Sequence, residues 1–302
     1  ADTLSIIGFD DSNLPAGVTL SADFTAETVT VNFGDTYQSL AVSEQANISL
    51  SYTISDGQGG TDIGVVNVSV DGVNDAPVAG KDWLITDADT VLTGNVFETL
   101  FFGGFESFSA PDVDIDGDIF TVYSVNGLTE NVGQKITDVH GREFTLHADG
   151  SFVYDSAGAD DSLAAGWGLT AVAPSYQIID EHGVISASTQ VVIRVEGVND
   201  DPVAVADFGV AHEDDQSITF TFAQLVVNDL DVDGDTLTAI SFDTSLLPEG
   251  VTLTYDTTAA NVGDYTVTAN FGDLYQSLND GETDNFSFGY MVADGQGATD
   301  NG

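Results

Sequence analysis

Short segments in which apolar and small polar residues alternate run through the whole chain. They cover residues 28–33, 48–54, 66–70, 217–222 and 286–290. A period of two residues is typical of strands that bury one face and expose the other, and turn residues separate these segments at short intervals. No segment has a convincing helical period, and the 32 glycines would interrupt a helix repeatedly. The pattern therefore predicts an all-β protein.

The sequence is also built from repeats, which indicate an array of similar domains. Gly-Val-Asn-Asp-Ala-Pro at 72–77 recurs as Gly-Val-Asn-Asp-Asp-Pro at 197–202, and a loop of alternating aspartates at 112–118 recurs at 229–235. The pattern Tyr-x-x-x-Asp-x-x-Gly starts at residues 52, 176 and 290, and residues 33–40 have a near-copy at 271–278. We therefore divide the chain into unit one (1–77), unit two (78–202) and unit three (203–302).

The three units contain different portions of the repeat. The Asn-Asp-x-Pro motifs are 125 residues apart and the aspartate loops 117, so unit two carries an insertion, which we place near 97–108. Residues 2–4 match 235–237, so unit one lacks the N-terminal part of the repeat, and unit three lacks its last strand. A repeat of about 125 residues with seven or more short strands is typical of an immunoglobulin-like β-sandwich. We expect tandem sandwiches from within a longer array.

The charge balance narrows the range of partners. The chain has 4 Lys and Arg against 50 Asp and Glu, a formal net charge of −46. Such a chain repels phosphate backbones and anionic lipid head groups, so we expect no nucleic acid partner. We also expect no membrane insertion, because no apolar run reaches the roughly 18 residues of a membrane span. The absence of cysteine excludes disulfides, thiolate metal sites and cysteine nucleophiles.

The acidic residues are 39 Asp and only 11 Glu, and Asp is the residue of turns and of compact oxygen-ligand cages. Alternating carboxylates in the two aspartate loops point several oxygens at one centre, and without a cation they would repel one another. An oxygen-only, flexible site favours Ca²⁺ over Mg²⁺. The twelfth positions, Tyr123 and Ile240, cannot supply the bidentate glutamate of an EF-hand. The alternative is a solvated acidic turn. The predicted calcium ligands of the loops are Asp112, Asp114, Asp116, Asp118, Asp229, Asp231, Asp233 and Asp235.

The junctions between units carry a second set of oxygen ligands. In each, an acidic residue is followed by Asn-Asp and then by a proline, which suits a short linker that takes a cation from both neighbours. The alternative is an ordinary Asn/Asp/Pro turn, but the spacing matches at both junctions. The predicted linker ligands are Asp71, Asn74, Asp75, Glu196, Asn199 and Asp200.

Together these motifs resemble the bacterial cadherin-like and VCBS-type repeats of large secreted adhesins of the RTX class. The resemblance rests on Gly-Val-Asn-Asp-x-Pro at the unit ends, on Asp-x-Asp-Gly-Asp-x-Leu-Thr at 231–238 and on Ala-Asp-Gly-Ser-Phe-x-Tyr at 148–154. It covers nearly the whole chain. It implies cadherin-like sandwiches in a calcium-stiffened, extracellular rod on the bacterial surface that serves cell adhesion and biofilm formation. Its partners would be calcium ions and the neighbouring repeats.

The resemblance also implies which residues bind calcium. In the cadherin pattern, ligands come from the linker Asn-Asp, from the Asp-x-Asp loop and from the Asp that ends a Tyr-containing strand. This pattern adds Asp56, Asp180 and Asp294 to the residues above. An acidic pair near the start of the repeat adds Glu213 and Asp214, which unit two replaces with Ala88 and Asp89.

Other functions find less support in the sequence. The four histidines form no His-Glu-x-x-His motif, there is no Gly-x-Ser-x-Gly elbow, and every carboxylate pair equally suits a calcium cage, so we expect no enzyme. The alternative is a calcium-dependent carbohydrate-binding module of a secreted protein, although core filling explains the same aromatic residues. Its aromatic platform would be Trp83, Trp167, Phe101, Phe102, Phe105 and Phe108. A third interpretation is a salt-adapted protein with an acidic surface.

The order of the motifs also suggests self-association. In unit one a strand at 65–70 follows the Asp56 hairpin, whereas unit three ends at Gly302, where the corresponding strand should begin. A sheet without its last strand exposes unpaired backbone donors and acceptors. We therefore expect chains to associate end to end, with a terminal strand of one chain completing a sheet of another.

Overall fold

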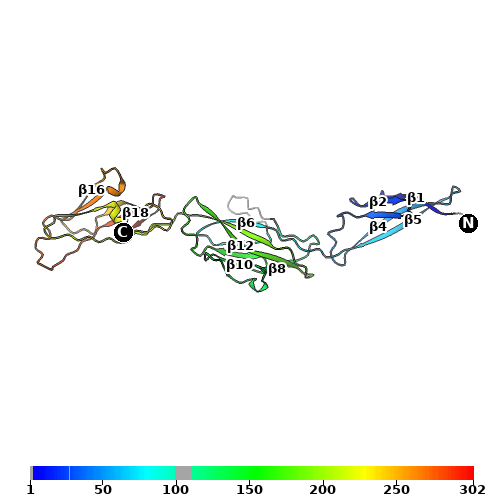
Figure 1. Ribbon diagram of the computed structural model, residues 1–302, viewed down its shortest axis with the longest axis horizontal. Coiled ribbons are helices and arrows are strands. Elements are labelled where there is room, and N and C mark those ends of the chain that lie inside the picture. The colour runs from blue at the N-terminus through cyan, green and yellow to red at the C-terminus, as the bar shows by residue number, and fades with distance from the viewer. Residues whose placement is uncertain (1–2, 27, 99–109) are drawn as a thin grey trace.

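A computed structural model describes residues 3–26, 28–98 and 110–302. The molecule is elongated, and the three units follow one another along its long axis (Figure 1). Among the described residues every sheet lies within one unit, and helical structure is limited to one four-residue α-helix and two 3-10 turns. None of these described helical segments is long and apolar enough to cross a membrane. The all-β class predicted from the alternating pattern is confirmed.

Unit two is a sandwich of two four-stranded sheets. The first sheet contains, in spatial order, β6 (Asp82–Asp87), β13 (Thr189–Glu196), β12 (Gly168–Asp180) and β8 (Phe120–Val125). The second contains β7 (Leu92–Asn95), β11 (Ser151–Asp155), β10 (Glu143–Leu146) and β9 (Ile136–Thr137). A 3-10 turn at Thr129–Asn131 follows β8. All neighbouring strands are antiparallel except β6 and β13, which run parallel.

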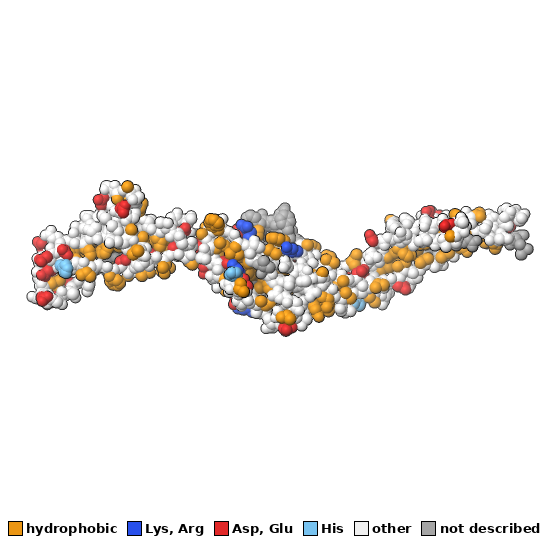
Figure 2. Space-filling view, in the orientation of Figure 1, with side chains coloured by type: hydrophobic (Ala, Val, Ile, Leu, Met, Phe, Trp, Pro, Cys, Tyr) orange, Lys and Arg blue, Asp and Glu red, His pale blue; other side chains and the backbone are white. Residues whose placement is uncertain are grey.

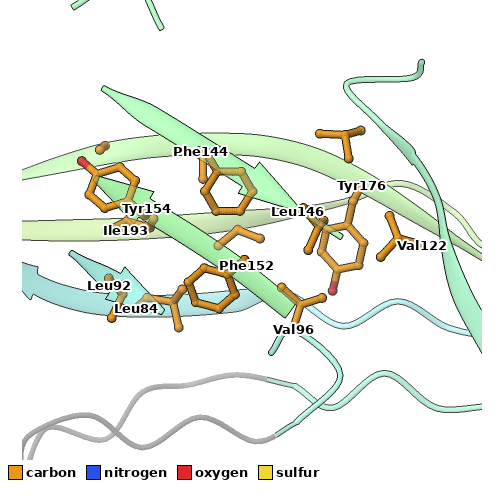
Figure 3. Packing of buried hydrophobic residues seen from close by; sticks show 14 of the residues in the cluster. Leu84, Leu92, Val96, Val122, Phe144, Leu146, Phe152, Tyr154, Tyr176 and Ile193 are labelled. Atoms are coloured by element: carbon orange, nitrogen blue, oxygen red, sulfur yellow. The ribbon is translucent and has the colours of Figure 1, made fainter. Parts of the chain in front are cut away.

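The inward residues of both sheets form one hydrophobic core (Figure 3). Leu84 and Ile193 of the first sheet are completely buried, and Phe144 stacks on Phe152 in the second with ring centroids 5.8 Å apart. Alternation along a strand places every second side chain on this face, and burying one such side chain contributes roughly 1.5–3 kcal/mol. The core therefore fixes the register of the strands, and with it the loops at both ends of the sandwich.

Units one and three follow the same plan with fewer strands. Unit one has a sheet of β1 (Ser5–Asp10), β4 (Gln45–Ser55) and β5 (Thr61–Asp71), and a hairpin of β2 (Thr19–Asp23) and β3 (Thr28–Asn32). Unit three has one sheet of β15 (Thr238–Asp243), β18 (Gly289–Ala293) and β19 (Thr299–Asn301). Its other sheet contains β14 (Ser217–Thr221), β17 (Thr266–Asn270) and β16 (Thr252–Asp256). Helix α1 (Phe222–Leu225) and a 3-10 turn at Val262–Asp264 complete unit three.

Two segments predicted as strands are only partly so. The strand predicted at 217–222 stops at Thr221, because Thr221 and Gln224 form a capping box that starts α1. The strand predicted at 286–290 starts only at Gly289, where its pairing with Asp243 of β15 begins. Residues 99–108 of the predicted insertion lie outside the described residues, and with them Phe101, Phe102, Phe105 and Phe108.

Positive charge is confined to the middle of the molecule. All Lys and Arg residues of the chain lie in unit two, namely Lys81, Lys135, Arg142 and Arg194. Figure 2 shows their blue side chains only on the central part, whereas acidic side chains appear along the whole length. Arg142 is bound to the buried carboxylate of Asp160, with Nη2 2.6 Å from Oδ1. Units one and three therefore have no Lys or Arg to balance their carboxylates.

Candidate metal centres at the two junctions

The linker between units one and two forms the first candidate centre, junction 1. Asn74 Nδ2 donates hydrogen bonds to Asp180 Oδ2 and to the carbonyl of Asp75, each at 2.9 Å. The Asp75 backbone N–H donates to Asp116 Oδ2 at 2.7 Å. A Cβ on Gly72 would overlap nearby backbone carbonyls of unit one, so glycine is needed where the linker leaves β5. The Asn-Asp pair of the linker is thus tied to two separate segments of unit two.

The aspartate loop of unit two lies against this linker. Asp114 Oδ1 accepts a hydrogen bond from the Asp116 backbone N–H at 2.9 Å, and Gly117 has φ +80°, so the loop closes on itself. Asp180, at the end of β12, joins the loop from a distant part of the sequence. Asp114, Asp118 and Asp180 each offer one carboxylate oxygen, and these atoms lie within 4.8 Å of one another. The fold therefore brings three of the predicted ligands together.

Junction 2, between units two and three, repeats this arrangement. Asn199 Nδ2 donates to Asp294 Oδ2 at 2.5 Å, and the Asp200 backbone N–H donates to Asp233 Oδ2 at 2.8 Å. Asp231, Asp233 and Asp235 offer carboxylate oxygens within 4.8 Å of one another. Because the same repeat positions make the same contacts twice, the geometry belongs to the repeat and not to one loop.

Both junctions contain buried side-chain oxygens that have no hydrogen-bond donor. At junction 1 these are Asn74 Oδ1, Asp114 Oδ2 and Asp116 Oδ1. At junction 2 they are Asn199 Oδ1, Asp231 Oδ2, Asp233 Oδ1 and Asp235 Oδ2. Leaving buried acceptors without a partner is costly, and such groups are rare in folded proteins. A hard divalent cation would satisfy them together, so the donor set of carboxylate and amide oxygens fits calcium.

The carboxylates at junction 2 also repel one another. Burial raises the pKa of Asp235, and the charges of Asp231 and Asp233 raise it further. Burial likewise raises the pKa of Asp200, with the largest charge contribution from Asp89 of unit two. A bound cation would relieve repulsion of this kind.

The first aspartate of each loop points into the core of its own unit and not toward the carboxylate cluster at the junction. Asp112 is 6% exposed and accepts a hydrogen bond from the Tyr176 hydroxyl at 3.1 Å, and burial raises the pKa of Asp112 to about 6. In unit three, Asp229 accepts hydrogen bonds from the Tyr290 hydroxyl at 3.0 Å and from the Val205 backbone N–H at 2.8 Å. These two predicted ligands therefore anchor the loops to the core, and their oxygens already have protein donors.

Five other predicted ligands form no hydrogen bond with the carboxylate cluster of junction 1 or of junction 2 among the described contacts. Asp71 ends β5 and accepts a hydrogen bond from the Gln45 side chain at 2.5 Å, and Glu196 ends β13. Asp56 accepts hydrogen bonds from backbone N–H groups of its own hairpin. Asp56 occupies the repeat position of Asp180, so it lies at the end of unit one that is far from junction 1. Glu213 and Asp214 precede β14 and occupy the positions of Ala88 and Asp89.

Asp161 was not identified from the sequence, and Asp89 was not counted among the predicted ligands. Both carboxylates raise the pKa of Asp200 by repulsion, which places them beside junction 2. Residues 160–163 read Asp-Asp-Ser-Leu where units one and three read Tyr-Gln-Ser-Leu, so Asp161 replaces the neutral Gln38 and Gln276. That exchange is the signal that could have identified Asp161. At this repeat position the N-terminal side of junction 2 carries a carboxylate, whereas that of junction 1 carries the neutral Gln38.

Junction 1 differs from junction 2 in a second way. His182 Nδ1 lies 2.8 Å from Asp118 Oδ2, whereas Asp235, the equivalent of Asp118, has a buried oxygen without a partner. Units one and three have glutamine, Gln58 and Gln296, at the position of His182. The hydrogen bond that the His182 ring donates to Asp118 raises the pKa of His182. A cation at junction 1 would therefore compete with a histidine for one of its carboxylates.

Comparison with known proteins agrees with this architecture. Residues 199–302 match the family model described as a bacterial Ig domain. The calcium-binding lectin RapA2 of Rhizobium johnstonii is 30% identical over 142 residues, which are 44% of this chain and 53% of the lectin. The chain thus spans about half the length of the curated relative that it matches.

Solved structures with a related backbone include cadherin repeats. Mouse cadherin-23 EC22–24 has 15% sequence identity and a TM-score of 0.45, over 99% of this chain and 83% of that one. The human desmocollin-1 ectodomain has 11% identity and a TM-score of 0.35, over 99% of this chain and 50% of that one. These similarities are too weak to bear on function.

The paired sheets and the family match define the class of protein. The chain is an all-β protein of tandem immunoglobulin-like units, whose last unit matches the bacterial Ig domain.

Proposed function

We propose that the chain is a calcium-binding structural segment of a bacterial cell-surface adhesin of the RTX class, made of cadherin-like, VCBS-type repeats. It acts outside the cell and catalyses no reaction, and its partners are calcium ions and the neighbouring units of the same protein. The observation that carries this proposal is the set of buried, unpartnered acceptor oxygens that recurs at both junctions. The name of its lectin relative, which describes a calcium-binding protein, supports the choice of ion.

The residues of the chain explain how an ion would stiffen the rod. Asn74 and Asp75 already hold the linker to unit two by hydrogen bonds, and Asn199 and Asp200 do the same for unit three. Bound calcium supplies the positive charge that the surrounding oxygens require. With the ion present, a pivoting movement at the linker would separate ligands from their ion, so it becomes costly.

Calorimetry and elemental analysis of the calcium-loaded chain test the proposal. We expect calcium bound at both junctions, with dissociation constants of about 10⁻⁴–10⁻³ M, as in extracellular modules. Asp116→Asn should weaken binding at junction 1 alone and Asp233→Asn at junction 2 alone, because each removes a carboxylate that contacts its linker. Asp149→Asn, in an exposed turn of unit two, is the matched control and should change nothing. An unmodified chain that binds no calcium at millimolar concentrations would contradict the proposal.

The second candidate is a calcium-dependent carbohydrate-binding module, which the lectin relative favours. Trp83 and Trp167 are 43% and 72% exposed, and a cavity of about 320 Å³ in unit two is lined by Arg142, Tyr154 and Gln190 among others. A cavity of this size is at the lower end of the range for small ligands. A glycan array in calcium-containing buffer separates the two candidates, because a purely structural segment should bind no sugar.

A further inference from the structure

The cavity of about 320 Å³ in unit two lies where its two sheets meet. Its lining comes from β9, β10 and β11 of one sheet and from β12 and β13 of the other, with loop residues between them. All of these lining residues lie within 126–190, inside the middle unit. None of them is a predicted calcium ligand, so the cavity is separate from both junctions.

An irregularity of β12 forms one wall of the cavity. The pairing of β12 with β13 shifts by one residue between Val172 and Ser175, and Pro174 in this bulge has no N–H to donate. Asn126, which has φ +52°, fixes the bulge from the opposite side. Its backbone N–H donates to the Ser175 carbonyl at 2.8 Å, and its Oδ1 accepts from the Ser175 N–H at 3.1 Å. The wall is therefore held by the backbone of unit two.

The hydroxyl of Tyr154 is the polar group that the fold leaves unsatisfied at this cavity. Tyr154 is 3% exposed, and its hydroxyl oxygen is buried without a hydrogen-bond partner among the described residues. Figure 3 shows this oxygen at the end of the ring that points away from Phe152 and Val96. Burial raises the pKa of Tyr154 to about 12, so the hydroxyl keeps its proton at neutral pH and can donate it. A buried hydroxyl without a partner is costly, so a polar group within the cavity would stabilise it.

Three polar residues at or beside the cavity are specific to unit two. The other units have apolar or aromatic side chains at the same repeat positions, and they form their sheets without these polar groups. Packing of the repeat therefore does not account for them. The three exchanges are Arg142 for Val18 and Val251, Tyr154 for Val31 and Ala269, and Asp160 for Tyr37 and Tyr275.

The charges around the cavity disfavour an anion. Arg142 is bound on two sides, with Nη2 2.6 Å from Asp160 Oδ1 and Nη1 3.3 Å from Asp138 Oδ2. Lys135 Nζ lies 2.5 Å from Glu143 Oε2. Three carboxylates thus surround two cationic groups, and no positive charge remains to attract a negatively charged ligand.

We propose that this cavity binds one neutral sugar ring, with a sugar hydroxyl accepting a hydrogen bond from Tyr154. The volume is at the lower end of the range for small-ligand sites, which suits a single ring. Ile136, Phe144 and Ala173 supply apolar surface for the C–H faces of the ring, as is usual in small-molecule sites with a few placed polar groups. The inference rests on the second candidate function above, and it gives that function a site that contains no predicted calcium ligand.

An NMR titration of the isotope-labelled 302-residue chain with glucose, galactose and mannose tests the proposal. We expect saturable shifts of the Asn126, Phe144 and Ser175 amide signals with at least one of these sugars, in calcium and in chelator alike. Glucuronate, a ring of the same size with a carboxylate, should bind at least about tenfold more weakly than glucose, because it meets Asp138 and Glu143. Absence of these shifts with all three sugars, or equal affinity for glucuronate, would overturn the proposal.

Tyr154→Phe tests the role of the hydroxyl. It should weaken sugar binding about three- to tenfold and leave the melting temperature unchanged, because the hydroxyl has no partner within the protein. Tyr123→Phe, on β8 and outside the lining of the cavity, is the matched control and should change neither. Unchanged sugar affinity in Tyr154→Phe would overturn the proposal and leave water as the partner of the hydroxyl.

The same titration distinguishes this inference from the functions proposed above. Sugar-induced shifts confined to the surroundings of Trp83 and Trp167 would overturn the cavity as the site, although the chain would still be a carbohydrate-binding module. No response to any sugar would contradict both the cavity and that module. Calcium binding at the junctions is measured separately by calorimetry, so its presence or absence does not decide this outcome.

Discussion

The asparagine of each linker is the residue at which the two halves of a junction meet. Asn74 and Asn199 use the amide nitrogen to hold an aspartate of the following unit, and each keeps a buried carbonyl oxygen without a donor. An aspartate in this position would add a negative charge and lose the donated hydrogen bond, so an amide is the side chain that serves both purposes. The position therefore explains why the repeat reads Asn-Asp and not Asp-Asp.

A first prediction concerns the asymmetry between the junctions. Asp161→Asn should weaken calcium binding at junction 2 about three- to tenfold, because it removes a negative charge beside Asp200, and should leave junction 1 unchanged. The reciprocal change Gln38→Asp should strengthen junction 1, because it places a carboxylate at the equivalent position. Site-resolved calcium titrations by NMR measure both effects. Equal effects of Asp161→Asn on both junctions would contradict the prediction.

A second prediction concerns the buried carboxylate of Asp112. Its pKa in the folded protein is raised to about 6 from an ordinary 3.8, because burial disfavours the charged form. The contribution of Asp112 to the free energy of unfolding is therefore complete below about pH 4 and is lost as the pH rises through 6. In the presence of chelator, Asp112→Asn should remove this loss and so gain up to about 3 kcal/mol relative to the unmodified chain between pH 4 and pH 7. Urea unfolding across this pH range tests the prediction. Asp149→Asn is the control, because the pKa of Asp149 is lowered and not raised.

Among the elements, the last strand of the repeat has different neighbours in units one and two. In unit two β13 is central, with a parallel neighbour on one side and an antiparallel neighbour on the other. In unit one β5 is an edge strand, and most of its apolar side chains are partly or fully exposed. An apolar residue on this strand is therefore buried where both neighbouring strands are present, as in unit two.

A third prediction compares isoleucines on these two strands. Ile193→Ala should cost about 2–5 kcal/mol of the unfolding free energy of unit two, because it opens a cavity in a closed core. Ile63→Ala, on β5, is the matched control and should change stability by less than about 0.5 kcal/mol, because Ile63 is 68% exposed. Hydrogen exchange resolved by unit provides the measurement. Equal losses at the two positions would contradict this view of the strands.

The sequence allowed the strands and loops to be predicted better than the contacts between them. Period-two alternation located β3, β4 and β5 well, because a half-buried strand imposes that pattern on its own residues. It failed at residues 286–288, since pairing depends on a neighbouring strand that alternation cannot reveal. The linker and loop ligands were recognisable as repeated motifs, whereas the inward direction of Asp112 depends on Tyr176, which lies 64 residues away in the sequence. Asp161 was missed although its exchange for the neutral Gln38 and Gln276 of the other units is visible in the sequence.

At the scale of the whole molecule, repulsion between carboxylates opposes the close approach of neighbouring units when no cation is bound. A chain of net charge −46 repels itself along its length, and the two linkers are where carboxylates of different units come close. Hydrogen bonds through Asn74 and Asn199 resist this repulsion at single points. Cations at the junctions would both remove the repulsion and add contacts across the linker.

A fourth prediction follows for calcium removal. Chelation should lower the melting temperature, because a ligand that binds only the folded state stabilises it by about 2.7 kcal/mol at a hundredfold excess over its dissociation constant. It should also change the maximum dimension in small-angle scattering, because the linkers become free to bend. Molar sodium chloride in place of calcium is the control, and it should not restore the melting temperature. Unchanged melting and scattering after chelation would contradict the prediction.

The confinement of Lys81, Lys135, Arg142 and Arg194 to unit two also determines how the protein can be digested. Trypsin cleaves only after lysine and arginine, so it has no target in unit one or unit three, whether these are folded or not. Residues 1–81 and 195–302 should survive as intact limit fragments. The rate at which they appear measures the accessibility of unit two alone. Trypsin-like enzymes can therefore cut residues 1–302 only within unit two.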